Sequence, residues 1–299
     1  MAGRHPIARG IAILCIVIVV FFAMVFAMTV GTDGDLGSAL ALGDKVGVVE
    51  VRGVISESDD VVEALKEFER APAVKAVVLR VESPGGGVAP SQEIYDAVRR
   101  LRASKPVIAS FGGVAASGGY YVASACDAIV ANPGSITGSI GVVMQLGNLE
   151  GLLDKLGVDA EIVKSGRYKD MGSPVRALAP EERRLFQEMI DSVHTQFIDA
   201  VARGRGMDLE RVRALADGRI YSGEQAHAAG LVDALGGLEE AVAMAAERGG
   251  ITGEPRVSHA RAAGVPWWFH LLFDFAPAGL GYGPPAMGLQ LLYGGPFLR

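Results

Sequence analysis

A serine in a stretch of small residues could act as a nucleophile. Ser117 lies within Phe111–Tyr121, the run Phe-Gly-Gly-Val-Ala-Ala-Ser-Gly-Gly-Tyr-Tyr, and the apolar segment Pro106–Phe111 leads into it. The apolar segment predicts a buried strand that the glycines break, and the small residues up to Ala125 predict a helix. A strand-to-helix turn exposes a hydroxyl, and the first N–H groups of the helix point toward what it attacks. The alternative interpretation is a tight glycine and alanine crossing in a packed core.

A serine hydroxyl needs a base before it becomes a nucleophile. Histidine is the usual partner, and the chain has five: His5, His194, His227, His259 and His270. The first precedes an apolar N-terminal run, the next two fall within predicted helices, and the last two lie in an irregular tail. None stands at a strand end or a glycine-rich turn, so the sequence disfavours a Ser-His-Asp triad.

A neutral lysine is the alternative base. Serine–lysine pairs are among the variants of the triad, and full burial lowers the pKa of a lysine by roughly 3–5 units. The candidate is Lys169, in the turn-rich segment Val163–Pro174 that follows a predicted strand. Lys164 is the rival, but it ends that strand. The alternative interpretation is that Lys169 is an ordinary solvated loop lysine.

Two glycine-rich segments could complete such a site. Ser83–Gly87 (Ser-Pro-Gly-Gly-Gly) ends the predicted strand Val74–Val81, and its glycines can present N–H groups to a ligand. No Gly-Lys-Ser/Thr follows, and Pro90 replaces the last glycine of a Gly-x-Gly-x-x-Gly pattern, so an oxyanion hole is favoured over a phosphate site. In Thr137–Gly141, Ser139 could hydrogen-bond the lysine amine, and the alternative is a turn serine.

Strands and helices alternate around these segments, which predicts an α/β domain with parallel βαβ units over residues 45–250. Strands are predicted at 46–51, 74–81, 106–111, 128–131, 140–145 and 160–164. Helices are predicted at 59–70, 89–103, 148–156, 180–204, 209–216, 222–229 and 238–248. Pro180, followed by two glutamates, marks the start of the longest helix.

Residues 11–30 are uncharged and strongly apolar, which matches the roughly 20 residues that a membrane-spanning helix needs. A cleaved signal peptide has a shorter apolar core and a small-x-small cleavage site, so we expect an uncleaved anchor. Two arginines and no acid precede this run, whereas three aspartates follow it. The positive-inside rule then leaves residues 1–10 in the cytoplasm and the main domain outside the cell membrane. Residues 31–44 are predicted to be a linker.

Composition narrows the class of protein. The formal charge of −6 and the pI of about 5.5 disfavour a nucleic-acid binder. Cys15 lies in the apolar run and Cys126 in a core-like context, so we expect no disulfide, no metal site and no cofactor. In the tail, residues 251–299, Pro and Gly interrupt aromatic clusters. The pair Trp267-Trp268 suits either a membrane interface or a neighbouring subunit.

Taken together, four segments resemble the bacterial signal peptide peptidases of type A, membrane-anchored serine proteases of the Clp/crotonase-like superfamily. The matching segments are 83–87, 115–121, 137–141 and 164–170, and later similarities are at 204–207 and 216–221. The likeness covers about 45–249 in order and is closest to the short, single-copy form of the family.

This resemblance implies a Clp/crotonase-like fold of repeated ββα units and a Ser-Lys dyad. Ser117 is then the nucleophile, Lys169 the general base and Ser139 the residue that orients the lysine. The N–H groups of Gly86 and Gly118 form the oxyanion hole. The family acts on apolar peptides such as remnant signal peptides. Its short form assembles into a homo-oligomeric ring or dome, in which the serine and the lysine of one site come from neighbouring subunits.

Three alternatives stay open at this point. A stomatin-associated membrane protease of the Clp class shares the dyad logic. A crotonase-type acyl-CoA enzyme uses glycine N–H groups for a thioester enolate, but the anchor, Lys169 and the lack of an obvious acid/base carboxylate pair disfavour it. A non-catalytic membrane scaffold is disfavoured because Ser117 and Lys169 are both intact.

Overall fold

The computed structural model describes residues 18, 20, 43–260 and 290–292. Residues 18 and 20 are helical, but the rest of the predicted anchor 11–30 and nearly all of the predicted linker 31–44 lie outside the described residues. Among the helices that are described, none combines the length and the apolar character needed to cross a membrane.

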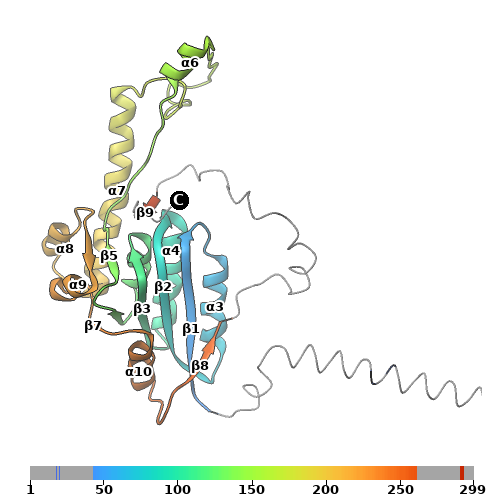
Figure 1. Cartoon of the computed structure of the whole chain (residues 1–299), viewed down its shortest axis with the longest axis vertical. Helices are drawn as coiled ribbons and strands as arrows, with labels where there is room; N and C mark the ends of the chain where they lie inside the picture. Colours follow the sequence, from blue (N-terminus) through green and yellow to red (C-terminus); the bar gives the residue numbers. More distant parts are fainter. Residues whose placement is uncertain (1–17, 19, 21–42, 261–289, 293–299) are drawn as a thin grey trace, which may run out of the picture. The chain divides into compact units, whose positions relative to one another are not determined.

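A mainly parallel sheet forms the centre of the described unit that begins at Asp44 (Figure 1). Neighbouring strands follow the order β6-β5-β3-β2-β1-β8, with β4 beside β3 and β7, and β9 beside β2. Only the β2–β9 and β5–β6 pairs are antiparallel among the described strands. The strands are β1 Lys45–Ile55, β2 Val74–Gly87, β3 Val107–Ala116, β4 Ala128–Ala131, β5 Ile136–Gly138, β6 Ile220–Ser222, β7 Ala234–Leu235, β8 Arg256–His259 and β9 Gln290–Leu292.

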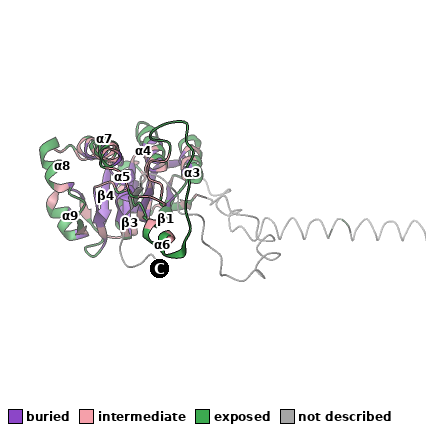
Figure 2. Ribbon diagram, turned by 90° about the horizontal axis from the view of Figure 1, so that it is seen from above, coloured by how far each residue is buried: buried purple, intermediate pink, exposed green. Residues whose placement is uncertain are grey.

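Helices pack around the sheet, so that the central strands β2, β3 and β4 are mostly buried while exposed residues lie on the outer helices (Figure 2). The helices are α3 Asp59–Arg70, α4 Val88–Arg102, α5 Gly118–Ala123, α6 Glu150–Leu156, α7 Pro180–Arg205, α8 Leu209–Leu215, α9 Gly223–Ala229 and α10 Leu238–Arg248. The mixed α/β class predicted from the alternation of elements is confirmed.

Side chains of β2 alternate between two hydrophobic cores. Val77 and Leu79 belong to the larger core, which includes Leu65 of α3. Val78 points to the opposite face and belongs to the smaller core with Ala245 of α10. Because successive residues of a strand face opposite sides, a strand covered on both faces is apolar throughout. Each fully buried Val or Leu side chain stabilises the fold by about 1.5–3 kcal/mol relative to exposure.

Strand β3 continues past the glycines that were expected to break it. The Glu82 carboxylate accepts hydrogen bonds from the N–H groups of Gly113 (2.8 Å) and Val114 (3.2 Å). The Ser135 hydroxyl donates to the carbonyl of Gly112 at 2.6 Å. These side chains satisfy backbone groups at the point where the strand leaves β4 and joins β5, so the chain stays extended up to Ala116.

Two predicted strands, 140–145 and 160–164, are wrong. The strand in the first region is β5, Ile136–Gly138, which pairs with β3. Residues 160–164 have the β-branched composition of a strand but are all exposed, and no described strand pairs with them. A high β-propensity does not make a strand where no neighbour supplies hydrogen bonds and packing.

Residues 143–180, here named the arm, extend away from the sheet together with the first part of α7 (Figure 1). No residue of α6, which lies in the arm, is buried. Large apolar side chains of the arm face solvent: Leu152, Leu156 and Val163 are 54%, 66% and 92% exposed. The arm therefore presents apolar surface that the described part of the chain does not cover.

The tail, for which the sequence predicted no structural role, contributes two strands to the sheet. β8 pairs in parallel with the first part of β1, and β9 pairs with the last three residues of β2.

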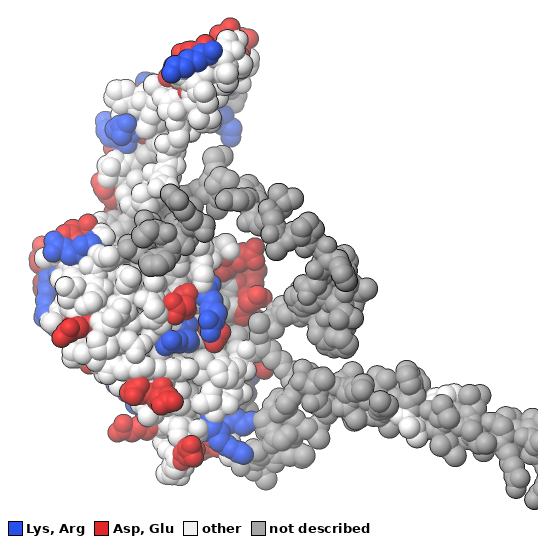
Figure 3. Space-filling model, viewed as in Figure 1, with Lys and Arg blue, Asp and Glu red and all other residues white. Residues whose placement is uncertain are grey.

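On the face drawn in Figure 3, acidic and basic side chains are interspersed, and no broad basic area appears on its described part.

Candidate active site

Ser117 lies between the end of β3 and the start of α5, with a buried hydroxyl. The residue is 1% exposed, and its Oγ has no hydrogen-bond partner among the described residues. Its backbone N–H donates to the carbonyl of Gly138 in β5 at 2.8 Å. Nearly all buried polar groups in folded proteins are paired, so an unpaired hydroxyl points to a role beyond structure.

The backbone at Ser117 is strained in the same way as that at Ser139. These two are the only described residues other than glycine with a positive φ, at 52° and 50°. Such conformations cost on the order of 1–3 kcal/mol each and gather at functional sites. The pairing of β3 with β5 aligns Ala116 with Gly138, so each strained serine directly follows one member of this pair. The structure therefore brings the predicted nucleophile and the predicted orienting serine together.

Gly86 and Gly118 approach each other beside this junction. A Cβ added to Gly118 would lie 3.2 Å from the N atom of Gly86 and 2.7 Å from Oγ of Ser91. A Cβ added to Gly86 would lie 2.2 Å from the carbonyl oxygen of Ile55 in β1. Both positions are therefore too close-packed for a side chain, and the backbone N atom of Gly86 lies close to Gly118, the residue that follows the serine.

Lys169 lies apart from these four residues. It is exposed and stands in a turn of the arm, where its backbone N–H donates to the carbonyl of Gly166 at 3.1 Å. Within the described residues its ammonium has no hydrogen bond or ion pair, and none joins it to Ser117. The arm extends away from the sheet, so one chain does not bring the predicted serine and lysine together.

The described histidines give no alternative base. His194 lies on α7, His227 on α9 and His259 on β8. The Nδ1 atom of His227 lies 3.1 Å from the carbonyl oxygen of Val232, which fixes the ring within its own loop. No hydrogen bond joins any of these three rings to Ser117.

Two tyrosines after the serine anchor α5 in the core. The buried hydroxyl of Tyr120 donates to the carbonyl of Leu231 at 2.8 Å, and burial raises its pKa. The ring of Tyr121 meets that of Phe197 on α7 edge-on, with centroids 5.0 Å apart. These contacts hold the helix whose first N–H groups face the candidate site.

Burial also raises the pKa of the Cys126 thiol, which makes it an inert core residue.

Strand β9 lies at the candidate site, which sequence reasoning missed. Its backbone pairs antiparallel with Gly85–Gly87, placing Leu291 opposite Gly86. The other edge of the same part of β2 is occupied by β1, which aligns Ile55 with Gly86. The edge that receives β9 is thus the one on the side of β3. The tail sequence is interrupted by Pro and Gly and carries no strand signal that could have revealed this pairing.

A cluster of ion pairs in the arm was also missed. Arg176 binds Asp170 at 2.7 Å and Glu182 at 2.6 Å, and Lys164 also binds Asp170. Hydrogen bonds from Arg176 and then Lys164 hold the pKa of the Asp170 carboxyl well below its usual range. Arg176, and next the N–H of Ala179, lower that of Glu182. Among the residues of this cluster, only Glu182 could have been recognised from the sequence. It is the third residue of a predicted helix, where an acidic side chain can cap the helix start.

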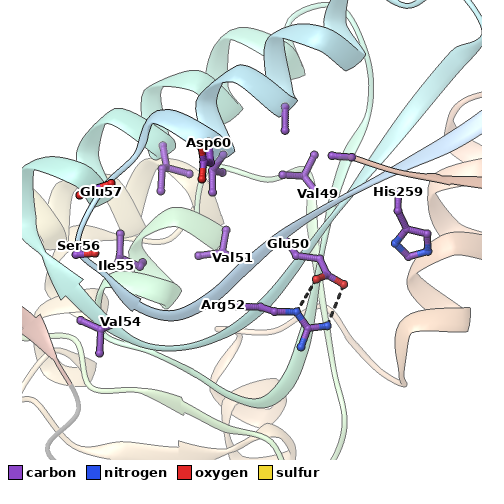
Figure 4. Close-up of a pocket in the computed structure, with 14 residues that line it drawn as sticks. Val49, Glu50, Val51, Arg52, Val54, Ile55, Ser56, Glu57, Asp60 and His259 are labelled. Atoms are coloured by element: carbon purple, nitrogen blue, oxygen red, sulfur yellow. Dashed lines mark hydrogen bonds and ion pairs between the residues drawn. The ribbon is translucent and has the colours of Figure 1, made fainter. Parts of the chain in front are cut away.

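A separate cavity of ≈ 450 Å³ lies over β1 (Figure 4). Its apolar wall includes Val49, Val51 and Ile55, and the ion pair between Glu50 and Arg52 lies at its rim. None of the sequence-predicted site residues lines it, so it is not part of the candidate site.

Two protein-family models match overlapping parts of the chain. The model of peptidase family S49 matches residues 99–252, which include Ser117, Ser139 and Lys169, and the model of Clp protease matches residues 49–134, which include Gly86. The protein slr0021 of Synechocystis, named as a candidate protease, is 46% identical over 209 residues, which cover 69% of this chain and 75% of that protein.

Two further relatives are longer proteins. The chloroplastic serine protease SPPA of Arabidopsis thaliana is 35% identical over 70% of this chain and 33% of its own length. Protease 4 of Salmonella typhi is 36% identical over 72% of this chain and 36% of its own length. The chain thus spans about a third of these two relatives. The family matches, the relatives and the parallel α/β fold show that the chain belongs to peptidase family S49, a family of serine proteases.

Proposed function

We propose that this protein is a membrane-bound endopeptidase that cleaves apolar peptides, such as remnants of signal peptides, by means of a Ser117–Lys169 dyad. One observation carries the proposal. The buried Ser117 hydroxyl has no partner and stands at a strained strand-to-helix junction beside the backbone of Gly86 and Gly118. This is the arrangement that an acyl-transfer nucleophile needs.

The proposed reaction proceeds through an acyl-enzyme. Neutral Lys169 takes the proton of Ser117 as the hydroxyl oxygen attacks the substrate carbonyl carbon. The N–H groups of Gly86 and Gly118 stabilise the tetrahedral oxyanion, and one such donor is worth about 2.7–4 kcal/mol in comparable enzymes. The ammonium then protonates the leaving amine. A water molecule deprotonated by the same lysine releases the acid product and restores the serine. Ser139 orients the lysine amine.

The substrate binds as an extended strand in this proposal. Strand β9 supports it, because a segment of extended chain pairs antiparallel with Gly85–Gly87 in the described residues. Addition of a strand to a free sheet edge is a common mode of peptide recognition, in which main-chain hydrogen bonds give affinity. A peptide in that position would pass its carbonyl group over the backbone N–H of Gly86 and next to Ser117.

The lysine of each site comes from a neighbouring subunit in this proposal. Two observations support it: Lys169 stands exposed on the arm, and the arm carries uncovered apolar side chains such as Leu156 and Val163. A second copy of the chain can cover this surface and deliver the arm to the next serine. The apolar residues 11–30 anchor each subunit with its N-terminus in the cytoplasm and its catalytic domain outside, where apolar peptides leave the membrane.

Peptide hydrolysis and active-site labelling test the proposal on the full chain in detergent micelles. We expect Ser117→Ala to abolish both cleavage of an apolar fluorogenic peptide and labelling by a fluorophosphonate. We expect Lys169→Met to abolish cleavage with the fold intact. Ser124→Ala is the matched control. It removes another buried hydroxyl, at the end of α5, which donates to the carbonyl of Tyr121. We expect this variant to keep both peptide cleavage and fluorophosphonate labelling. Near wild-type turnover in Lys169→Met would refute the dyad.

A further inference from the structure

Arg176 joins the turn that carries Lys169 to the first turn of α7. Its Nε donates to Oδ2 of Asp170 at 2.7 Å, and its two Nη atoms donate to Oε2 and Oε1 of Glu182 at 2.9 and 2.6 Å. Its two remaining N–H groups donate to the carbonyl oxygens of Asp170 and Ala177, both at 3.1 Å. All five N–H groups of the guanidinium therefore have an acceptor, which is the full capacity of an arginine.

The carboxylates in this cluster are largely withdrawn from solvent. The side chains of Asp170 and Glu182 are 8% and 6% exposed. The second oxygen of Asp170 accepts from the ammonium of Lys164, so both of its oxygens are occupied. A fully satisfied cluster of this kind is rigid, and removal of one partner leaves an uncompensated charge in a poorly solvated place.

Lys169 is the exception in its own turn. The two side chains before it, Arg167 and Tyr168, both bind Glu181 on α7, and Asp170 after it binds the cluster. The Lys169 ammonium alone has no partner among the described side chains and faces solvent. Its nearest carboxylate in sequence is thus engaged elsewhere, although an ammonium next to a free carboxylate normally pairs with it.

We propose that Arg176 is a positioning residue for Lys169. It fixes the turn to the start of α7, so that the lysine points outward from a rigid support. It also withholds the Asp170 carboxylate from the lysine ammonium, so that the lysine can lose its proton. This inference rests on the proposed role of Lys169 as the general base.

The inference predicts a change in pH dependence. When Arg176 is replaced by Gln, Oδ2 of Asp170 loses its donor while Oδ1 keeps that of Lys164, so one carboxylate oxygen becomes free next to Lys169. A nearby opposite charge favours the charged form of a lysine over the neutral form. Because only the neutral lysine acts as the base, activity then appears at higher pH. The other charged or titratable groups around this turn are Lys164, Arg167, Tyr168, Glu181, Glu182 and Arg184.

The test is the pH profile of kcat/KM for peptide cleavage by the full chain in detergent micelles. We expect Arg176→Gln to lower kcat/KM at neutral pH at least tenfold and to move the acid limb of the profile upward by about one pH unit. The double variant Arg176→Gln/Asp170→Asn removes the released acid, so its acid limb is to return to the wild-type position. Arg213→Gln, which breaks an exposed ion pair with Glu210 on α8, is the matched control and is to change neither quantity.

Two outcomes would overturn the inference. One is an Arg176→Gln variant that loses activity while its acid limb stays in place, which indicates a merely structural role. The other is a double variant whose acid limb does not return. If Arg176→Gln does not fold, as judged by circular dichroism, Arg176→Lys replaces it. Lysine keeps a positive charge but donates fewer hydrogen bonds than arginine, so Asp170 is released only in part. A smaller upward shift is then expected, and its absence counts against the inference. Full activity of Lys169→Met would instead contradict the proposed function, on which this inference rests, whereas the two outcomes above contradict the positioning role alone.

Discussion

Single residues at the β3–α5 junction are held in conformations that only the surrounding structure makes tolerable. Ser117 and Ser139 both adopt positive φ, and the carbonyl of Gly138 between the strands accepts the N–H of Ser117. The carbonyl of Arg219 accepts the N–H of Ser139 at 2.8 Å. Each strained serine is thus fixed by a backbone hydrogen bond from another segment. This fixation aims a hydroxyl without using that hydroxyl to stabilise the fold.

A methyl group at Gly118 tests the oxyanion hole. Its Cβ would lie 3.2 Å from the N atom of Gly86, in the space where the developing oxyanion is expected to bind. We expect Gly118→Ala to lower kcat by about 100-fold, because the methyl group keeps the oxyanion away from its donors, and loss of contact with one donor costs roughly 10²–10³ in comparable enzymes. Gly134→Ala is the control, since nothing lies within 4 Å of its added Cβ. A wild-type kcat in a folded Gly118→Ala variant would remove this residue from the proposed site.

Four of the five residues that the sequence singled out lie together in the structure, whereas Lys169 lies apart. Ser117, Gly86, Gly118 and Ser139 stand in glycine-rich segments at strand ends, and parallel strands bring such ends to one edge of a sheet. This rule does not predict where Lys169 lies, because the arm that carries Lys169 contains no strand of the sheet.

At the scale of elements, the first turn of α7 supports the arm by means of charge. The helix begins at Pro180, and the following Glu181 and Glu182 accept hydrogen bonds from the turn around Lys169 and from Arg176. Carboxylates also interact favourably with the N-terminus of a helix. These carboxylates at the start of α7 thereby cap the helix and hold the loop that precedes it.

This support should weaken in acid. Asp170 has a depressed pKa in the folded protein, so its contribution is present above the ordinary pKa of about 4 and is lost as the pH falls through the depressed value. We expect amide hydrogen exchange in residues 164–176 to be several-fold faster in Asp170→Asn than in wild type at pH 6. The ratio of the two rates is to fall toward one as the pH is lowered to 2.

The control for this measurement is Asp191→Asn, at an exposed residue on α7 whose carboxylate accepts a hydrogen bond from Gln187. It is to leave exchange in residues 164–176 unchanged at every pH. A rate ratio for Asp170→Asn that stays constant between pH 6 and pH 2 would contradict the electrostatic origin of the support.

Strand β9 occupies the sheet edge that the proposed substrate needs. Since Leu291 lies opposite Gly86, the tail and a peptide substrate compete for the same backbone groups. We expect Leu291→Pro, which cannot continue a ladder of strand hydrogen bonds, to lower KM several-fold with kcat unchanged. Leu291→Ala keeps the backbone groups and serves as the control with a wild-type KM. Identical KM values for both variants would show that β9 does not compete with substrate.

Most elements could be predicted from periodicity because they are covered by a core. Helix Asp59–Arg70 and strand Ala128–Ala131 match the prediction residue for residue, and both pack in a core. The prediction of a strand at 160–164 was wrong, because a strand depends on a neighbouring strand, which periodicity does not reveal. The extension of β3 to Ala116 was not predicted, because side chains distant in sequence, such as Glu82, accept hydrogen bonds from the N–H groups of its glycine segment.

At the scale of the whole molecule, the described residues leave the arm uncovered and place no base beside the serine. The arm exposes large apolar side chains, among them Leu152 and Val163, and carries Lys169 on its surface. The sheet holds Ser117, whose hydroxyl lacks a partner. In the proposed function both features have one explanation, which is that a second copy of the chain packs on the arm and receives the lysine beside its own serine. The central claim is therefore a site completed between subunits.

Mixing two inactive variants tests this claim most directly. Full-length Ser117→Ala and Lys169→Ala are each expected to be inactive on an apolar fluorogenic peptide. Co-expressed in one detergent-solubilised assembly, they are predicted to recover a substantial fraction of wild-type activity, because some sites combine an intact serine with an intact lysine. An inactive mixed assembly beside an active wild type would contradict a dyad shared between subunits.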